Sequence, residues 1–220
     1  MYAIQKLDPN EATTLAKEAE AMKAKLPRHK TFSTSAKTLA LYAVMENTLN
    51  FVFPPCTALD RPERDVPVAK STNIIDLSGV GLKQLWLLKD HIQDASVLAN
   101  THCPEILDRT FVVWAPSFFP MVWGWIKRWF DPDMVAKMHI LSRSEARGSL
   151  EAFVDLDDIP KLYGGNLDWE YPSPPSMDAA VKAHVESDGF PGWTEGPCRW
   201  MGGRRIPVGT VKGIARRPSI

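Results

Sequence analysis

Apolar positions recur at helical spacing along the N-terminal part of the chain. Residues 8–26 begin with an aspartate and a proline, which are typical of a helix start, and leucine, alanine and methionine then follow three or four residues apart. A second helix is predicted over residues 36–50, ended by the two prolines at 54–55. No glycine occurs before Gly79, so we expect the opening of the chain to be mostly helical.

Beyond residue 70 the pattern changes, and short apolar runs alternate with segments of helical spacing. Strands are predicted at residues 73–77, 111–114 and 138–141. Helices are predicted at residues 82–98 and 145–154. In the first of these helices four apolar side chains are expected to face the core: Leu82, Leu85, Trp86 and Ile92. Short apolar strands separated by helices are typical of an α/β fold, in which a mostly parallel sheet is flanked by helices.

The most apolar stretch runs from residue 114 to 137 and contains four of the eight tryptophans. On a helical wheel one face carries Phe118, Val122, Trp125 and Trp129, and another carries Phe119, Trp123, Ile126 and Phe130. A helix that is apolar on most sides has no ordinary solvent face. At about 1.5 Å per residue, a helix of the thirteen residues from 118 to 130 would reach only about 20 Å, too short to span a bilayer. It is therefore either a buried core helix or a helix with protein or ligand on one side and lipid on the other.

Composition narrows the class of protein. The chain carries 26 basic and 26 acidic residues, so no affinity for nucleic acid is expected. Residues 201–220 hold five basic residues and no acid, which fits either a solvated tail or attraction to an anionic membrane. Three widely spaced cysteines indicate neither a disulfide framework nor a zinc site. Because no signal-peptide core or membrane-spanning stretch is found, we expect a cytoplasmic protein that contacts membranes peripherally.

Motifs for catalysis or nucleotide binding are missing from the sequence. The Gly79-Val80-Gly81 run lacks the third glycine of the dinucleotide fingerprint, and neither a P-loop nor a hydrolase serine elbow occurs. The five histidines have no metal-ligand spacing, and His139 is interpreted as a packed strand residue. We therefore expect no enzymatic activity, no metal and no cofactor.

Two charged residues, Glu105 and Lys137, lie beside predicted apolar strands. Buried charges are costly unless they are paired. Either both side chains are solvated at the surface, or they form the polar end of an apolar cavity. In the second case the lysine would meet a phosphate and the carboxylate would accept hydroxyl donors.

Five segments occur in the order and spacing of a known family. They are residues 75–80, 103–105, 112–116, 130–141 and 159–165. This series resembles the lipid-binding half of a CRAL-TRIO domain, the fold of phosphatidylinositol/phosphatidylcholine transfer proteins. The resemblance divides the chain into a divergent N-terminal helical segment (1–40), a CRAL-TRIO lipid-binding domain (41–166) and a proline- and glycine-rich basic C-terminal extension (167–220). Residues 1–40 do not resemble the family's front part, which leaves open whether its first strand and a closed pocket are present.

The resemblance implies that the sheet forms the base of a hydrophobic lipid pocket. The aromatic helix would close this pocket as a gate. The gate face would carry Phe118, Val122, Trp125 and Trp129. Four residues match the family's lipid-contacting positions: Glu105 and Lys137 at an inositol head group, and Ser71 and Asn73 at a choline-lipid phosphate. Asn73 stands where the family has a threonine.

The implied function is non-enzymatic binding and transfer, or sensing, of phosphatidylinositol between membranes, with phosphatidylcholine as a second ligand. The implied partners are such a lipid and, transiently, a membrane surface, and the chain is expected to be a monomer. Three alternatives stay open from the sequence. One is a carrier of another hydrophobic ligand, such as a sterol, tocopherol or retinoid. Another is a lipid-free regulatory or scaffold module. The third is an enzyme, which a cluster of ionisable groups with shifted pKa values in a cleft would indicate.

Overall fold

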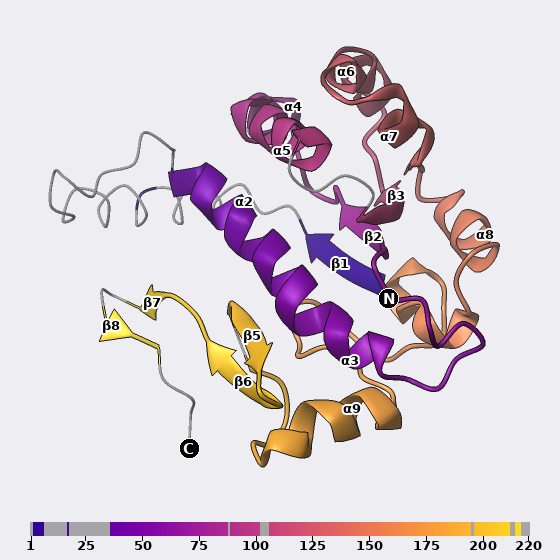
Figure 1. The fold of residues 1–220 in the computed structure, drawn as a ribbon. Helices are drawn as coiled ribbons and strands as arrows, with labels where there is room; N and C mark the ends of the chain where they lie inside the picture. The colour runs from indigo at the N-terminus through magenta and orange to yellow at the C-terminus, as the bar shows by residue number, and fades with distance from the viewer. Residues whose placement is uncertain are drawn as a thin grey trace, which may run out of the picture. The chain divides into compact units, whose positions relative to one another are not determined.

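The structure is a computed structural model that describes residues 2–6, 17, 36–87, 89–101, 106–194, 196–211 and 214–216 (Figure 1). The chain forms two compact units. The first combines Met1–Ala12 with Lys70–Ser173, and the second combines Thr13–Ala69 with Pro174–Ile220. The domain boundaries expected at residues 40 and 166 stay a prediction. The helix expected over residues 8–26 lies outside the described residues except at Lys17, which is helical.

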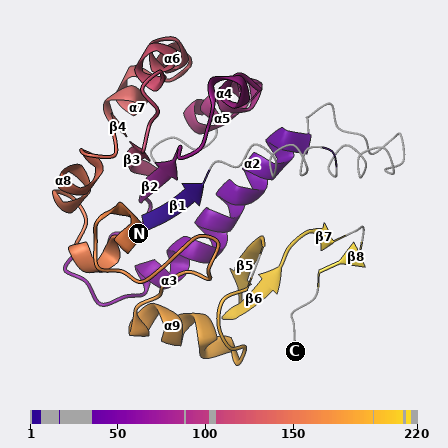
Figure 2. The same ribbon diagram turned by 180° about the vertical axis from the view of Figure 1, so that it is seen from behind.

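A four-stranded, all-parallel sheet forms the centre of the first unit. Its strands lie in the order β1 (Tyr2–Lys6), β2 (Ser71–Asp76), β3 (Leu107–Val113) and β4 (Met138–Ile140). The predicted α/β fold with a parallel sheet is confirmed, and all three predicted strands are present. The edge strand β1 was not predicted. It pairs with β2 from Tyr2↔Thr72 onward, as Figure 2 shows from behind. A run of five residues has too short a pattern to predict a strand from the sequence, because whether such a run forms a strand depends on the partner strand beside it.

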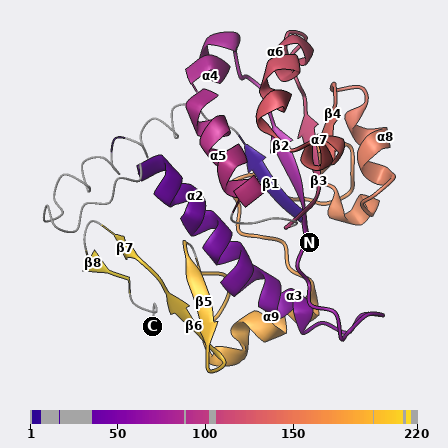
Figure 3. The ribbon, with the colours of Figure 1, turned by 45° about the horizontal axis from the view of Figure 1, so that its top comes forward.

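Helices cover both faces of this sheet. They are α4 (Leu82–Leu87), α5 (Lys89–Thr101), α6 (Phe119–Ile126), α7 (Pro132–Ala136) and α8 (Ala146–Glu151). Short 3-10 turns follow at Lys127–Trp129, Leu156–Asp158 and Lys161–Tyr163. Figure 3 shows α4 and α5 beside the sheet on one side and α8 on the other. The described part of the chain contains no helix that is long and apolar enough to cross a membrane.

Alternation along the strands divides the apolar side chains of the first unit between two cores. One core lies on the α8 side and consists of Ile74, Phe111, Val113, Leu141, Ala146, Leu150, Val154, Ile159 and Tyr163. The other lies under α4 and α6 and consists of Leu77, Val80, Leu85, Val112, Phe119, Val122 and Ile126. His139 stacks on Phe111 with ring centroids 5.0 Å apart, which confirms its interpretation as a packed residue.

The segment after α8 closes the first core through a buried hydrogen bond. The Tyr163 hydroxyl donates to the Asp76 carboxylate at 3.0 Å, and the Ser78 backbone N–H donates to the same carboxylate at 2.6 Å. Burial, followed by the neighbouring carboxylate, raises the pKa of Tyr163 far above its ordinary value, so the hydroxyl keeps its proton and remains a donor. At Gly165 any Cβ would overlap the carbonyl oxygen of Ile159, so this turn requires glycine.

The second unit contains α2 (Ala36–Asn47), a π-helical turn (Thr48–Val52), α3 (Phe53–Thr57), α9 (Ala179–Val185) and a 3-10 turn (Glu186–Asp188). Two hairpins follow, β5 (Cys198–Met201) with β6 (Arg204–Pro207), and β7 (Thr210–Val211) with β8 (Ile214–Ala215). The predicted helix over 36–50 is confirmed. The prolines at 54–55 do not end it, because they occupy the first turn of α3, where proline is tolerated.

The basic extension is partly built into this second unit. The Arg205 side chain is 2% exposed and its Nε lies 2.9 Å from the Asp188 carboxylate, which is itself 0% exposed. The guanidinium also donates to the carbonyl of Gly192 and the hydroxyl of Thr194. The charge of Arg205 therefore neutralises a buried acid. At this residue, the basic extension is neither a solvated tail nor a membrane contact.

Candidate functional site

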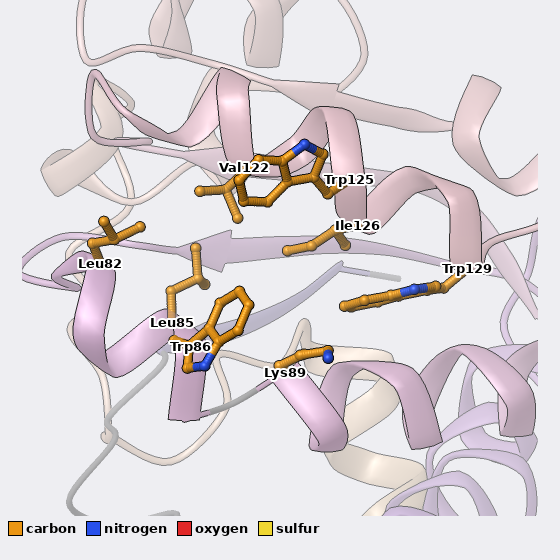
Figure 4. Close-up of a pocket in the computed structure, with 8 residues that line it drawn as sticks. All are labelled: Leu82, Leu85, Trp86, Lys89, Val122, Trp125, Ile126 and Trp129. Atoms are coloured by element: carbon orange, nitrogen blue, oxygen red, sulfur yellow. The ribbon is translucent and has the colours of Figure 1, made fainter.

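An apolar pocket of about 220 Å³ lies between α4 and α6 in the first unit (Figure 4). Leu82, Leu85 and Trp86 line it from α4, and Lys89 lies at the start of α5. Val122, Trp125, Ile126 and Trp129 line it from α6 and the following 3-10 turn. Both sets recur at spacings of three and four residues, so each helix presents one continuous apolar stripe to the pocket.

The base of the pocket is continuous with the core under α4 and α6. Leu85, Val122 and Ile126 are buried and belong to that core, together with Val112 from the centre of the sheet. Trp129 packs partly against the same core. The pocket therefore rests on well-packed side chains, and its base is apolar throughout.

The rim of the pocket consists of large apolar side chains that remain exposed. Leu82 is 50% exposed and Trp86 is 62% exposed on α4. Trp125, on α6, is 52% exposed, and Met121, one turn before it, is 58% exposed but does not line the pocket. Leu82 and Trp86 were expected to face the core, and this expectation is wrong for both. Grouped exposed apolar side chains are uncommon on folded proteins and mark binding surfaces more often than isolated ones do.

The predicted gate face is only partly brought together at this pocket. Val122, Trp125 and Trp129 line it, whereas Phe118 caps the start of α6 and packs against the core. Ile126, which was assigned to the other face, also lines the pocket. The helix thus has one buried side and one exposed side, and both are apolar. That α6 acts as a moving gate stays a prediction.

Gly124 lies in the middle of α6, where glycine is unfavourable. A Cβ built at this position would meet no atom within 4 Å. Close packing of the backbone therefore does not account for this glycine. The physical effect that remains is a local weakening of the helix.

Three of the four predicted polar residues, Ser71, Asn73 and Lys137, do not line the pocket. Ser71 is buried at the start of β2, and its hydroxyl donates to the Ile106 carbonyl at 3.4 Å. Asn73 is half-buried and pairs in register with Thr110. Lys137 is half-buried directly before β4, and its carbonyl accepts from the Thr110 backbone N–H at 2.9 Å.

Strand β3 therefore separates Lys137 from Ser71 and Asn73, and none of the three lines the pocket. Glu105 lies outside the described residues, so its predicted position beside Lys137 stays a prediction. Within the described ranges, no group of three or more His, Cys, Asp or Glu side chains could hold a metal ion.

Sequence reasoning missed the part that α4 and Lys89 play in the pocket. The signal was present, since Leu82, Leu85 and Trp86 form an apolar stripe. Spacing identifies such a stripe, but it does not show whether protein covers it.

Comparison with known proteins places this geometry in a family. Residues 8–165 match the CRAL/TRIO domain. The chain belongs to the CRAL/TRIO domain family. The matched range begins upstream of the CRAL/TRIO resemblance seen in the sequence, so it includes most of the N-terminal segment that was expected to diverge.

Two curated relatives show how far the likeness extends. The chain is 34% identical over 128 residues to the phosphatidylinositol/phosphatidylcholine transfer protein SFH12 of Arabidopsis thaliana, covering 57% of this chain and 23% of that protein. It is 31% identical over 99 residues to the Sec14 cytosolic factor of Schizosaccharomyces pombe, covering 45% of this chain and 34% of that one. The matched part of the CRAL/TRIO chain thus spans about a quarter of the first relative and about a third of the second.

A crystal structure of Sfh5 is also similar, at 22% identity over 37% of this chain and 28% of that chain. The TM-score of this match is 0.34.

Proposed function

We propose that this chain binds a phospholipid and moves it between membranes without changing it chemically. Phosphatidylinositol is the proposed ligand, and phosphatidylcholine the second. The observation that carries the proposal is the apolar pocket between α4 and α6 in a CRAL/TRIO domain. The names of relatives such as SFH12, a phosphatidylinositol/phosphatidylcholine transfer protein, support the choice of lipid.

The driving force for binding would be burial of acyl chains against the pocket. Each methylene group removed from water contributes about 0.8 kcal/mol. Pockets that hold a drug-sized ligand measure roughly 300–1,000 Å³, so a pocket of 220 Å³ holds only part of a two-chain lipid. Admission of the whole lipid would require α6 to move away from α4. Gly124 is a point at which α6 would bend most easily.

The exposed rim would provide the contact with the membrane. Trp86 and Trp125 are the residue type enriched at membrane–water interfaces, and the charged side chains of Lys127 and Arg128 are exposed on the 3-10 turn that follows α6. Such a surface would bind at the depth of the lipid head groups without spanning the bilayer. The proposal implies a cytoplasmic monomer that meets membranes peripherally.

Head-group recognition is assigned to the sequence-predicted residues. Lys137 and Glu105 would contact the inositol head group, and Ser71 and Asn73 a choline-lipid phosphate. The half-buried position of Lys137 is compatible with a charge-assisted hydrogen bond to a ligand. No catalytic role is proposed for any of these residues.

The proposal is tested by identifying the lipid that copurifies with the chain and by measuring transfer of labelled phosphatidylinositol between vesicles. Trp125→Ala is expected to slow transfer several-fold, because it removes an exposed aromatic ring from the pocket rim. Leu162→Ala is the control, since Leu162 is also exposed but lies on a 3-10 turn that does not line the pocket. A copurified sterol, or absence of phosphatidylinositol transfer by the parent protein, would refute the proposal.

A further inference from the structure

Lys89 is the only charged side chain among the eight described residues that line the pocket. The other seven are leucine, isoleucine, valine and tryptophan. In Figure 4 the lysine lies at one edge, with Trp86 and Trp129 on either side of it. The arrangement is that of an apolar cavity with a single positive charge at its mouth.

The ammonium group of Lys89 is held at this position by an aromatic ring. Its Nζ lies 5.3 Å from the centroid of the Trp86 ring, within the range of a cation–π interaction. Among the residues whose side chains the structure describes, no carboxylate lies within salt-bridge distance of this Nζ. A lysine ammonium has three donors, and the face of one ring does not satisfy all of them. It can therefore donate to an anion at the mouth.

The volume of the pocket limits what can accompany that anion. A cavity of about 150 Å³ lined by apolar side chains holds one benzene molecule. At 220 Å³, the pocket has space for a section of one hydrocarbon chain, and two chains side by side would need a larger opening. Apart from the indole N–H groups of its three tryptophans, the lining is hydrocarbon, and Lys89 is the one described lining residue with a charge to pair with an acid group. The charged end of a ligand is therefore placed at the mouth, beside Lys89.

We infer that, as it stands between α4 and α6, the pocket binds a single-chain anionic amphiphile, with a section of the hydrocarbon chain inside and the acid group paired with Lys89. Fatty acids are the chemical class to which this applies. The inference uses the same pocket as the proposed phospholipid function and adds a second ligand class and a new anion-binding residue. A long-chain alcohol of equal length would gain the same apolar burial but not the ion pair.

Isothermal titration of the full chain with myristate, below its micelle concentration, tests the inference against tetradecanol. Lys89→Met keeps an apolar side chain of similar length but removes the charge, and Lys89→Arg restores a charge. Lys83→Met is the matched control, since Lys83 is exposed on α4 and does not line the pocket. We expect Lys89→Met to weaken myristate binding by about two- to fivefold, because the ion pair lies at a partly solvated rim.

Lys89→Arg and Lys83→Met should bind myristate like the parent protein, and tetradecanol should not distinguish any of the variants. Equal myristate affinity in Lys89→Met and the parent would overturn the inference, as would absence of myristate binding or equal affinity of the parent for acid and alcohol. Phosphatidylinositol transfer measured on the same preparations separates the two ideas. If transfer persists without myristate binding, the inference fails alone. If myristate binds but no transfer occurs, the proposed function fails alone.

Discussion

Replacing Gly124 by alanine separates a bending role for this residue from a packing role. A Cβ at this position meets no atom within 4 Å, and Gly124 is not among the residues with positive φ. Alanine is favoured over glycine inside a helix by about 0.8–1 kcal/mol, and changes of this type without strain stabilise whole proteins by about 0.4–1 kcal/mol. For a chain of this size, that corresponds to a rise in Tm of about 1–4 °C.

The same stabilisation should slow lipid transfer if α6 has to bend at Gly124 to open the pocket. A cost of about 0.4–1 kcal/mol in the opening step corresponds to about a two- to fivefold lower rate. Thermal unfolding and vesicle transfer are measured on the same preparation. Gly148→Ala is the matched control, because Gly148 lies in α8, its Cβ would also meet no atom within 4 Å, and it does not line the pocket.

We expect the control to raise Tm by a similar amount and to leave transfer unchanged. A lower Tm for Gly124→Ala would show that the structural argument about free space is wrong. A raised Tm with parent-like transfer would show that α6 does not bend at this residue during opening.

Three further changes test the structure and the head-group prediction. Gly165→Ala should destabilise the chain by about 1–3 kcal/mol in urea unfolding, because its Cβ would overlap the Ile159 carbonyl. Arg205→Met should cost about 3–5 kcal/mol at neutral pH, because it leaves the buried Asp188 carboxylate without its partner. Lys137→Ala should weaken phosphatidylinositol binding by about 1.5–3 kcal/mol in a titration, the usual size of a charge-assisted hydrogen bond.

The Arg205 prediction includes a pH dependence. Burial by itself would raise the pKa of Asp188, but hydrogen bonds from the Arg205 side chain and backbone and from the Phe190 backbone N–H outweigh it, so the pKa is lowered. A carboxyl group with a lowered pKa in the folded state stabilises the protein above its unfolded pKa of about 3.9. This stabilisation is lost as the pH falls through the folded value. The penalty of Arg205→Met should therefore shrink below about pH 4.

Each of these three predictions would be contradicted by a different result. A parent-like urea midpoint for Gly165→Ala would mean that the turn at 159–165 adapts easily. A penalty for Arg205→Met that is constant from neutral pH down to about pH 2 would mean that Asp188 is not the group responsible. Equal phosphatidylinositol affinity for Lys137→Ala and the parent would remove Lys137 from the proposed head-group site.

The parallel sheet could be predicted because its signals are local. The apolar run at 111–114 is recognisable without knowledge of the rest of the chain, and helical spacing before and after it excludes a simple hairpin. The strand at Tyr2–Lys6 could not be predicted in the same way. Its pairing with β2 joins residues about seventy positions apart, and such contacts leave no periodic pattern in the sequence.

The candidate site was predictable only in part. Val122, Trp125 and Trp129 were assigned to one face of a helix, and the structure places them around one pocket. Trp86 was assigned to the core and is instead exposed at the rim, with Lys89 beside it. An apolar stripe has the same appearance in a sequence whether it is covered or open.

Residue spacing was therefore sufficient to predict strands β2, β3 and β4, the helical segments between them and the apolar character of the stretch around Trp125, because these depend on neighbours within a few positions. Which apolar faces remain open, and which charge lies at the mouth, depends on how α4 and α6 pack over the same sheet face. Burial is a property of the partners that a side chain meets, and these partners come from distant parts of the chain.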